Sequence, residues 1–199
     1  QHKIWILAGS LVIRIADDKL VNRSFLFAPD GTNTARYDKI HMFDADLPNG
    51  EHYHESKSFH AGDKAVVTET PWGTIGLTIC YDLRFAALHR ALAKAGARII
   101  TVPAAFTVPT GKLHWHVLLR ARAIETGCFI VAPAQCGVHD GGRMTYGHSL
   151  IIDPSGTIIA EAGDAPQIIT AEIDLSLVDA ARRMVPSLTH DRVFELGTE

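Results

Sequence analysis

The chain has 199 residues, of which 47% are hydrophobic, and a mean hydropathy close to zero. This length buries one sizeable core and is too short for two typical domains, so we expect a single soluble domain over residues 1–199. Nineteen Lys and Arg stand against 22 Asp and Glu along the chain, and the net charge is -3. This balance excludes a basic footprint for nucleic acid and a polybasic patch for a membrane surface.

Cysteine usage and hydropathy point to the cytoplasm. The three cysteines, Cys80, Cys128 and Cys136, are an odd number without C-x-x-C spacing, so we expect neither a disulfide framework nor a zinc knuckle. No stretch approaches the roughly 20 apolar residues of a membrane span. Because the sequence begins with Gln1, we expect it to be trimmed, processed or copied from an incomplete reading frame.

Three segments share one design, in which an apolar or β-branched run is followed by a Pro-x-Gly turn and a second run. Proline presets φ for a turn and the glycine adds conformational freedom, so each segment predicts a β-hairpin. The three first runs and their turns are residues 24–28 before Pro29, residues 65–68 before Pro71, and residues 149–153 before Pro154.

Helical and strand patterns alternate after the second hairpin, which predicts a layered α/β domain with a mixed sheet. The clearest helix has an apolar stripe at helical spacing and a glycine stop. The predicted elements are a helix over 82–95 with Leu83, Ala87, Leu88, Ala91, Leu92 and Ala95 on one stripe and Gly96 as its stop, a strand over 98–102, a helix over 112–126 ending at Gly127, a strand over 128–132, a strand over 167–173, and a helix over 175–183 capped by Asp174.

The segment 73–84 delivers a cysteine, Cys80, from a strand rich in Ile and Thr into the turn before a helix. A helix N-terminus carries partial positive charge and favours the thiolate, which is the form that attacks carbonyl groups. Cys80 is therefore a candidate nucleophile. The alternative is a buried apolar cysteine, which is the commonest role of a free cysteine.

Two further segments carry charged residues that bear on this choice. Lys39 lies in residues 37–44 after the first hairpin, and Glu55 follows a turn expected at residues 48–50. Taken alone, each side chain would be a solvated surface group. The order of the three segments carries more information than any one residue.

Together these segments resemble the nitrilase superfamily of carbon–nitrogen hydrolases. That family has a Glu, then a Lys in a K-x-H-x-F-D-like segment, then a Cys in C-Y-D-x-R. Lys39 and Cys80 match the second and third members, and Glu55 matches an additional glutamate of many members. The segments 114–125 and 146–149 are also similar to family motifs, and residues 119–126 and 134–139 look most like the branch that hydrolyses deaminated glutathione.

The resemblance implies a fold and a reaction. The fold would be α/β, a four-layer αββα sandwich of two mixed β-sheets, here lacking the first strand and helix, and subunits would pair through a helical face as a homo-oligomer. Cys80 would attack the amide carbonyl of a small-molecule substrate, while Lys39 and the backbone N–H of Tyr81 hold the oxyanion. Ammonia would leave, water would release the acid from a thioester, and Glu55 would orient Lys39 or the substrate. No cofactor is implied.

Three departures from the family pattern stand out. None of the 38 residues before Lys39 is Glu, so we expect the general base to be absent and residues 1–199 to turn over amides negligibly. His116 replaces a more usual Glu, and Ala86 with Ala87 replaces the Pro-Glu that usually follows Arg-Phe.

Other residues receive smaller roles. Pairs among the 11 histidines, such as His114 and His116, point in different directions on a helix and form no His-Glu-x-x-His motif, so no metal site is expected. Ser149 lacks the G-x-S-x-G context of a nucleophile and is expected to cap or line a strand. We expect Cys128 to be core and Cys136 to line the pocket without reacting.

Substrate recognition is assigned to residues beyond the reacting groups. Arg84 is either a structural salt-bridge partner or a clamp for a substrate carboxylate. Phe106, Thr107 and the segment 135–145 would set selectivity for the acyl side.

Alternative functions stay open at this point. Within the enzyme class they are a 2-oxo acid ω-amidase, an N-carbamoyl amino acid hydrolase and a nitrilase. Outside it, the chain would be a truncated, inactive copy that serves as a structural subunit or does not fold alone.

Overall fold

A six-stranded mixed sheet lies in the middle of the computed structural model, which describes residues 2–47 and 50–197. Its strand order is β13-β12-β9-β8-β7-β6, and the central strands β7, β8 and β9 run parallel while the outer pairs are antiparallel. Parallel neighbours require crossover connections, and these carry helices α1 and α3. The strands are β6 Val66–Thr70, β7 Gly73–Leu77, β8 Ile99–Thr101, β9 Phe129–Ala132, β12 Leu150–Ile152 and β13 Ile158–Glu161.

A three-stranded antiparallel sheet packs on one face of the central sheet. It consists of β1 Ile6–Ala16, β2 Lys19–Phe27 and β3 Asn33–Asp38, in that order. Leu26 and Tyr37 of this sheet are buried in one cluster with Ile75 and Leu77 of β7. Apolar side chains of the two sheets therefore form a core between them.

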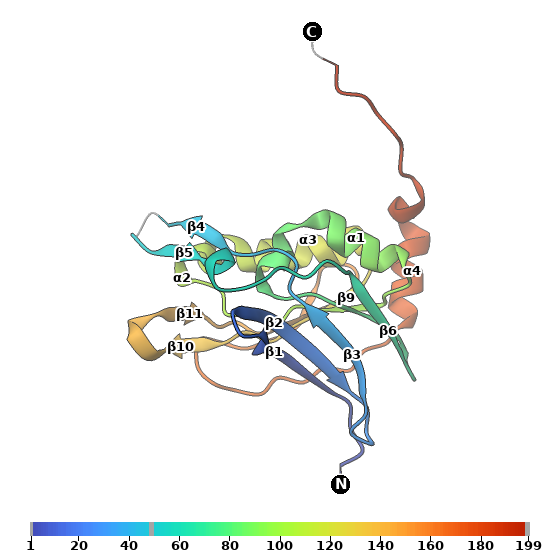
Figure 1. The fold of residues 1–199 in the computed structure, drawn as a ribbon. Coiled ribbons are helices and arrows are strands. Elements are labelled where there is room, and N and C mark those ends of the chain that lie inside the picture. The colour runs from blue at the N-terminus through green and yellow to red at the C-terminus, as the bar shows by residue number, and fades with distance from the viewer. Residues whose placement is uncertain (1, 48–49, 198–199) are drawn as a thin grey trace.

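Helices α1 (Ala86–Lys94) and α3 (His116–Thr126) cover the opposite face of the central sheet, as Figure 1 shows. Leu92 of α1 and Leu119 of α3 are fully or almost fully buried against Ile100 and Ile130 of the strands. The helices pack there because their apolar faces cover strands that are buried on both sides. The described residues thus form three layers, helix, sheet and sheet.

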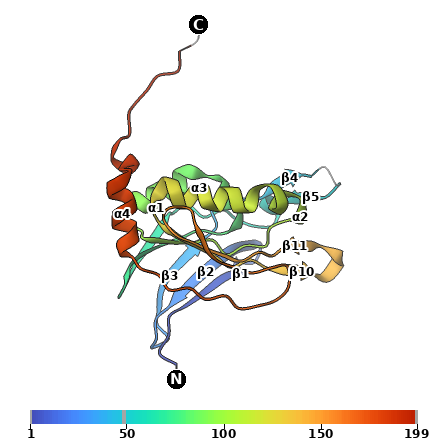
Figure 2. The same cartoon turned by 180° about the vertical axis from the view of Figure 1, so that it is seen from behind.

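Helix α4 (Ser176–Met184) stands at the edge of these layers in Figures 1 and 2. Arg182 donates hydrogen bonds to the carbonyl oxygens of Thr126 and Ala97, and Arg98 pairs with Asp179 at 2.8 Å. These contacts fasten α4 to the ends of α3 and β8. The chain after it extends away from the body of the molecule.

Short elements complete the structure. Two of them are β-hairpins, β4–β5 and β10–β11, which lie beside each other at one end of the molecule in both views. The turn expected at residues 48–50 lies partly outside the described residues. The elements are β4 Asp44–Asp46, β5 His52–His54, β10 Cys136–Val138, β11 Met144–Tyr146, α2 Val108–Thr110, a π-helical turn Gly111–Trp115, and 3-10 turns Glu55–Lys57, Cys80–Arg84, Asp140–Gly142 and Ser187–Thr189.

The structure confirms the three predicted hairpins as the antiparallel pairs β2–β3, β6–β7 and β12–β13. It also confirms that α3 ends at Gly127, which has φ 59°, a left-handed conformation that suits glycine. The helix predicted from residue 175 is present as α4, and the backbone N–H of Ser176 donates to Asp174 Oδ1 at 2.9 Å.

Two sequence predictions were wrong in detail. The helix over 82–95 is divided into a 3-10 turn and α1, and Ala87, Ala91 and Ala95 of the expected stripe are exposed while His89 and Ala93 are buried. A 3-10 turn has fewer residues per turn than an α-helix, so residues before and after the division do not share one face as a single helix would require. The strand predicted over 167–173 is absent from the described structure, and Ile168 is 92% exposed there. Apolar, β-branched composition alone does not make a strand without a neighbouring strand to pair with.

No helix in residues 2–47 and 50–197 combines the length and the apolar character that a bilayer crossing requires.

Candidate active site

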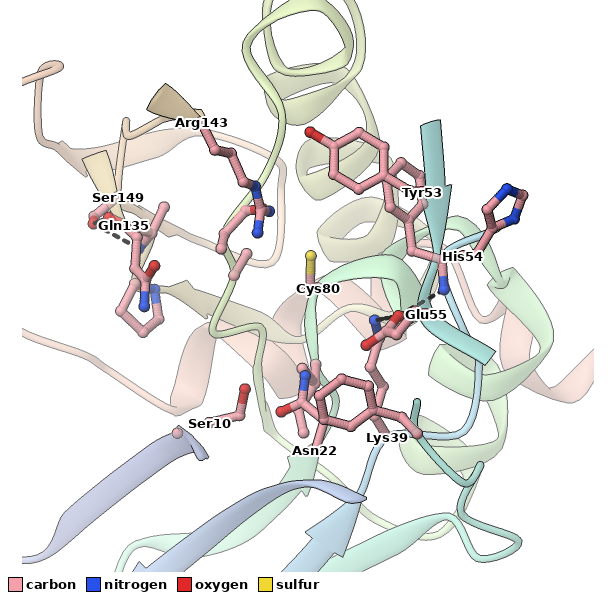
Figure 3. Close-up of a pocket in the computed structure, with 18 of the residues that line it drawn as sticks. Ser10, Asn22, Lys39, Tyr53, His54, Glu55, Cys80, Gln135, Arg143 and Ser149 are labelled. Atoms are coloured by element: carbon pink, nitrogen blue, oxygen red, sulfur yellow. Dashed lines mark hydrogen bonds and ion pairs between the residues drawn. The ribbon is translucent and has the colours of Figure 1, made fainter. Parts of the chain in front are cut away.

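A pocket of about 620 Å³ is lined by residues of the three-stranded sheet, of the segments that follow strands of both sheets and of the β4–β5 hairpin. Cys80, Lys39 and Glu55 all line it, although they come from three different segments of the chain. Figure 3 shows the Cys80 sulfur pointing into the space between Arg143 and Tyr53 on one side and Lys39 with Glu55 on the other.

The end of β7 delivers Cys80 to the pocket. The backbone N–H of Thr78 donates to Thr101 O at 3.1 Å, and that of Cys80 donates to Pro103 O at 2.9 Å. These bonds extend the parallel pairing of β7 and β8 beyond the strands. Cys80 then takes φ 48°, a left-handed conformation that is costly for any residue with a Cβ. The chain turns sharply at this residue and presents the thiol to the pocket.

The surroundings of Cys80 shift the pKa of its thiol in opposite directions. Burial raises its pKa above the ordinary value, while the positive charge of Lys39 and a backbone hydrogen bond from Ala105 lower it. Burial is the larger influence, because a thiolate loses hydration there. Where the sequence predicted the start of a helix, the structure has a 3-10 turn of five residues, Cys80–Arg84. The main source of positive charge near the thiol is therefore Lys39 and not the dipole of a long helix.

Lys39 and Glu55 form a buried ion pair beside Cys80. The distance from Lys39 Nζ to Glu55 Oε2 is 2.5 Å, and the side chains are 3% and 16% exposed. Backbone bonds fix the lysine, since its N–H donates to Asn22 O at 2.9 Å and its carbonyl accepts the N–H of Gly62 at 2.8 Å. Neither side chain is the solvated surface group that each would be when considered alone.

Glu55 also organises the loop that precedes it. Its Oε2 accepts the backbone N–H of Phe43 at 2.6 Å, and the Phe43 ring lies 5.0 Å from the rings of Tyr53 and Tyr81. The rings of Phe43, Tyr53 and Tyr81 form what we call the aromatic wall. The Glu55 carboxylate therefore holds Lys39 and this aromatic wall together. Its Oε2 thus accepts from two donors, one of which is the Lys39 ammonium, and hydrogen bonds that involve charged groups are the stronger ones.

Asp82 is a site residue that the sequence analysis quoted in a motif without giving it a role. It is fully buried and accepts hydrogen bonds from the Tyr37 hydroxyl at 2.7 Å, the Ile79 N–H at 2.8 Å and the His41 N–H at 3.1 Å. His41 Nδ1 also lies 2.7 Å from Asp82 Oδ1. Asp82 thus joins the segment around Lys39 to the turn that carries Cys80. Its place two residues after a candidate nucleophile was the available signal.

Tyr81 follows Cys80 at the start of the 3-10 turn, so its backbone N–H belongs to the same turn as the thiol. Its ring packs against Phe43 and Phe85. The Tyr81 side chain therefore belongs to the aromatic wall, with Phe43 on one side and Phe85 on the other.

Arg84, Phe106 and Thr107 do not line the large pocket. They line a small adjoining cavity with Tyr81, and Arg84 lies over the rings of Tyr81 and Phe106 at 5.8 and 5.4 Å. Phe106 and Thr107 are buried, at 4% and 2% exposed. The structure thus places these three residues in a separate small cavity, which Cys80 also lines, and not in the large pocket.

Arg143 is the pocket residue that the sequence analysis did not single out, although it lies in the segment 135–145 assigned to selectivity. Its guanidinium lies 5.5 Å from the centre of the Tyr53 ring and donates to Ala105 O at 3.0 Å. Among the described residues that line the pocket, Lys39 and Arg143 are the only Lys or Arg. Since Lys39 is paired with Glu55, Arg143 is the side chain placed to meet an anionic group.

The other two cysteines lie away from the reacting centre. Cys128 is buried in the core, where its Sγ donates to Ala97 O at 3.1 Å, as expected for a core residue. Cys136 begins β10 and pairs with Tyr146, but it is not among the described residues that line the pocket. Ser149 lines the pocket and its hydroxyl accepts the N–H of Ala134 at 2.8 Å, which fixes the wall rather than activating the serine.

The site therefore combines the half-buried thiol of Cys80, the paired ammonium of Lys39 and a second cation, Arg143. A thiol that attacks a carbonyl needs a positive group near the developing oxyanion, and Lys39 lines the same pocket as Cys80. Glu55 is the only carboxylate among the described residues lining the pocket. The chemistry that this set supports is acyl transfer through a thioester.

The sequence of this chain is similar to those of known carbon–nitrogen hydrolases, in agreement with the chemistry of the site. A family model described as carbon–nitrogen hydrolase matches residues 1–183. The chain is 47% identical over 198 residues to a deaminated glutathione amidase of Synechocystis, covering 98% of this chain and 72% of that protein. It is 39% identical over 200 residues to the omega-amidase NIT3 of Saccharomyces cerevisiae, covering 100% of this chain and 68% of that protein.

Solved structures agree with the fold. The crystal structure of the Caenorhabditis elegans NitFhit protein superposes with a TM-score of 0.90 at 41% sequence identity. The match covers 96% of this chain and 47% of that one, so the chain spans just under half of that protein. The sheets and helices described above are thus those of a known fold.

Proposed function

The chain belongs to the carbon–nitrogen hydrolase family, the nitrilase superfamily, and we propose that it is a cysteine-dependent amidase acting on a small carboxylate-bearing amide such as deaminated glutathione. One observation carries this proposal. The Cys80 thiol, the Lys39 ammonium and the Glu55 carboxylate line one pocket, and the last two are paired at 2.5 Å.

The reaction would follow from these positions. The Cys80 sulfur attacks the amide carbonyl carbon, the C–N bond breaks, and ammonia leaves with a proton taken from the site. Lys39 and the Tyr81 N–H would stabilise the negative oxygen of the tetrahedral intermediate. Water then attacks the thioester and releases the acid and the free thiol, so one water is consumed for each ammonia formed.

Glu55 has limited freedom to act as the general base. It already accepts hydrogen bonds from the Lys39 ammonium and the Phe43 N–H, both through its Oε2. Hydrolysis of the thioester also needs a base beside the attacking water. We therefore propose that residues 1–199 alone acylate Cys80 faster than they release product.

Arg143 supports a substrate with a carboxylate beyond the scissile amide. A guanidinium can form two parallel hydrogen bonds to a carboxylate, and stacking on Tyr53 holds its plane in place. The similarity to the deaminated glutathione amidase of Synechocystis supports deaminated glutathione as the substrate, and the similarity to the yeast omega-amidase supports a 2-oxo acid ω-amide as the alternative.

The test of the reaction measures ammonia release from deaminated glutathione and from a 2-oxo acid ω-amide, together with the mass of the intact protein during turnover. We expect an acyl adduct on Cys80 and a preference for one of the two amides. Cys80→Ala should form no adduct. Lys39→Ala should slow acylation by about 10²–10³-fold, as loss of one oxyanion donor does, and Glu55→Gln should slow it by about tenfold.

Two results would contradict the proposal. One is an adduct on Cys128 or Cys136 in place of Cys80. The other is undiminished ammonia release from Cys80→Ala. Addition of formate, a small external carboxylate, separates the two steps, since it should speed release of the adduct and leave its formation unchanged.

Compartment and assembly belong to the same proposal. A catalytic thiol must stay reduced, which supports the cytoplasm as its location. We also propose a homo-oligomer, without nucleic-acid or membrane partners, that pairs through the helical layer. Leu113, Val117 and Ile124 project from this layer and are 71%, 66% and 56% exposed.

A further inference from the structure

His116, His148 and Glu161 form a cluster on the protein surface that does not line the catalytic pocket. His116 starts α3, His148 lies between β11 and β12, and Glu161 ends β13. His116 Nε2 lies 2.9 Å and His148 Nδ1 lies 3.1 Å from the same oxygen, Glu161 Oε1. Three distant segments therefore direct one nitrogen or oxygen atom each at a single point.

The surrounding structure holds these side chains in place. The His148 backbone is fixed on both sides, because Trp115 Nε1 donates to His148 O at 2.7 Å and the His148 N–H donates to Gly163 O at 3.0 Å. The His148 ring stacks on Tyr146 at 4.4 Å between centroids and meets His116 edge to face at 5.4 Å. The three ligand side chains are between 27% and 39% exposed, so an ion could reach them.

We propose that these three residues bind a divalent transition-metal ion of the zinc type. A tetrahedral zinc ion with bonds of about 2.0–2.1 Å holds its ligand atoms about 3.4 Å apart. The three candidate atoms all lie within 4.8 Å of one another, and the two His–Glu distances would need to open by only a few tenths of an ångström. The fourth position would take water.

The donor set selects the kind of ion. Two imidazole nitrogens and one carboxylate suit zinc and its neighbours in the first transition row, whereas magnesium and calcium prefer oxygen ligands. The sequence pattern gave no sign of this set, since only the fold brings His116 close to His148 and Glu161.

The expected consequence is a cross-link between α3, the β11–β12 connection and β13. Ser149, directly after His148, lines the catalytic pocket and bonds to Ala134 in the pocket wall. An ion bound to His148 would therefore stiffen this wall without taking part in the amide chemistry. The proposal does not rest on the amidase function.

The experiment titrates the metal-free 199-residue chain with zinc chloride by calorimetry and by competition with a chromogenic chelator. Glu161→Gln and His148→Ala remove one ligand each and should weaken binding of one zinc ion by about 100-fold or more. His52→Ala is the matched control, since His52 forms a similar pair with Asp46 at 2.6 Å and no third ligand joins them among the described residues. It should bind like the wild type.

Cysteine is the competing zinc ligand in this chain, so Cys80→Ala and Cys136→Ala are titrated in parallel and should keep the site. Cobalt substitution gives a second readout: we expect weak visible bands of four-coordinate nitrogen and oxygen ligation without intense thiolate charge-transfer absorption.

Several outcomes would overturn the site. These are unchanged zinc affinity in both Glu161→Gln and His148→Ala, loss of binding in Cys80→Ala or Cys136→Ala, or equal affinity for magnesium. Circular dichroism of each variant shows whether it is folded, and a variant that is unfolded is replaced by His116→Gln, which keeps the size of the side chain.

Discussion

At the scale of single residues, the site depends on how charges are arranged around one buried thiol. Cys80 is desolvated, which disfavours the thiolate, and Lys39 offsets part of this effect. Lys39 is itself held by Glu55, so the three groups act on one another. The Cys80 pKa is thus set by tertiary contacts more than by the short turn that follows it.

Replacing Lys39 should make the Cys80 thiolate harder to form. In Lys39→Met the positive charge is lost and burial remains, so the midpoint of the pH profile for Cys80 alkylation should move to higher pH. Peptide mass spectrometry after brief iodoacetamide exposure measures this profile. Cys136 in the same samples is the internal control and should keep its profile, and a midpoint that moves to lower pH would show that Lys39 does not favour the thiolate.

Asp82 should be important for stability as well as for the site. Asp82→Ala leaves the Tyr37 hydroxyl and the Ile79 and His41 N–H groups without their acceptor in a buried position, so we expect a loss of about 3 kcal/mol in unfolding free energy. Urea unfolding measures it. Asp30, an exposed turn residue that accepts one local N–H from Thr32, is the matched control, and Asp30→Ala should change stability little. Similar losses in both variants would contradict the special role of Asp82.

At the scale of elements, close backbone contacts place the segment that carries Lys39. Gly62 donates its N–H to Lys39 O, and a Cβ at this glycine would lie 2.2 Å from Asp38 O. The neighbouring atom is backbone, so it cannot rotate away. The chain after β3 is therefore positioned by a contact that only glycine allows.

Gly62→Ala should displace this segment and with it the lysine. We expect a loss of about 2 kcal/mol in stability, typical of overpacking, and slower acylation of Cys80. Thermal or urea unfolding and the adduct assay measure the two effects. Gly163→Ala is the control, because a Cβ there meets nothing within 4 Å, and both effects should be absent. Unaltered acylation in Gly62→Ala would show that this backbone contact does not determine the position of Lys39.

At the scale of the whole molecule, one face of the helical layer is apolar and exposed. Leu113, Val117 and Ile124 are spaced to lie on the same side of the π-helical turn and α3. The chain after α4 extends away from the body and exposes Val193 and Phe194 at 101% and 80%. Apolar surface of this kind is typical of a face covered by another subunit.

The oligomer proposal predicts that one charge on this face separates the subunits. Wild-type protein should elute as a dimer or a higher multiple, and Val117→Glu should elute as a monomer. Size-exclusion chromatography with light scattering measures the masses. Val138→Glu, at an equally exposed position in β10, should leave the mass unchanged. A monomeric wild type, or equal dissociation by both variants, would refute pairing through this layer.

The sequence by itself determined the parts that depend on neighbours along the chain. The Pro-x-Gly turns and the glycine after α3 are local signals, since φ preferences act within a few residues, and they placed three hairpins and the end of a helix correctly. The ordered motifs around Lys39, Glu55 and Cys80 also named three residues that the structure brings to one pocket.

Only the tertiary structure decided what depends on distant partners. Residues 167–173 have a strand-like composition but pair with no strand in the part of the chain that the structure describes. The stripe of the helix predicted over 82–95 was displaced by the sharp turn at Cys80. Arg84 lines the small cavity next to Cys80, whereas Arg143 lines the large pocket. The roles of Asp82 and of the His116, His148 and Glu161 cluster arise from contacts between segments far apart in sequence, because hydrogen bonds and ligand geometry depend on distance in space and not on spacing along the chain.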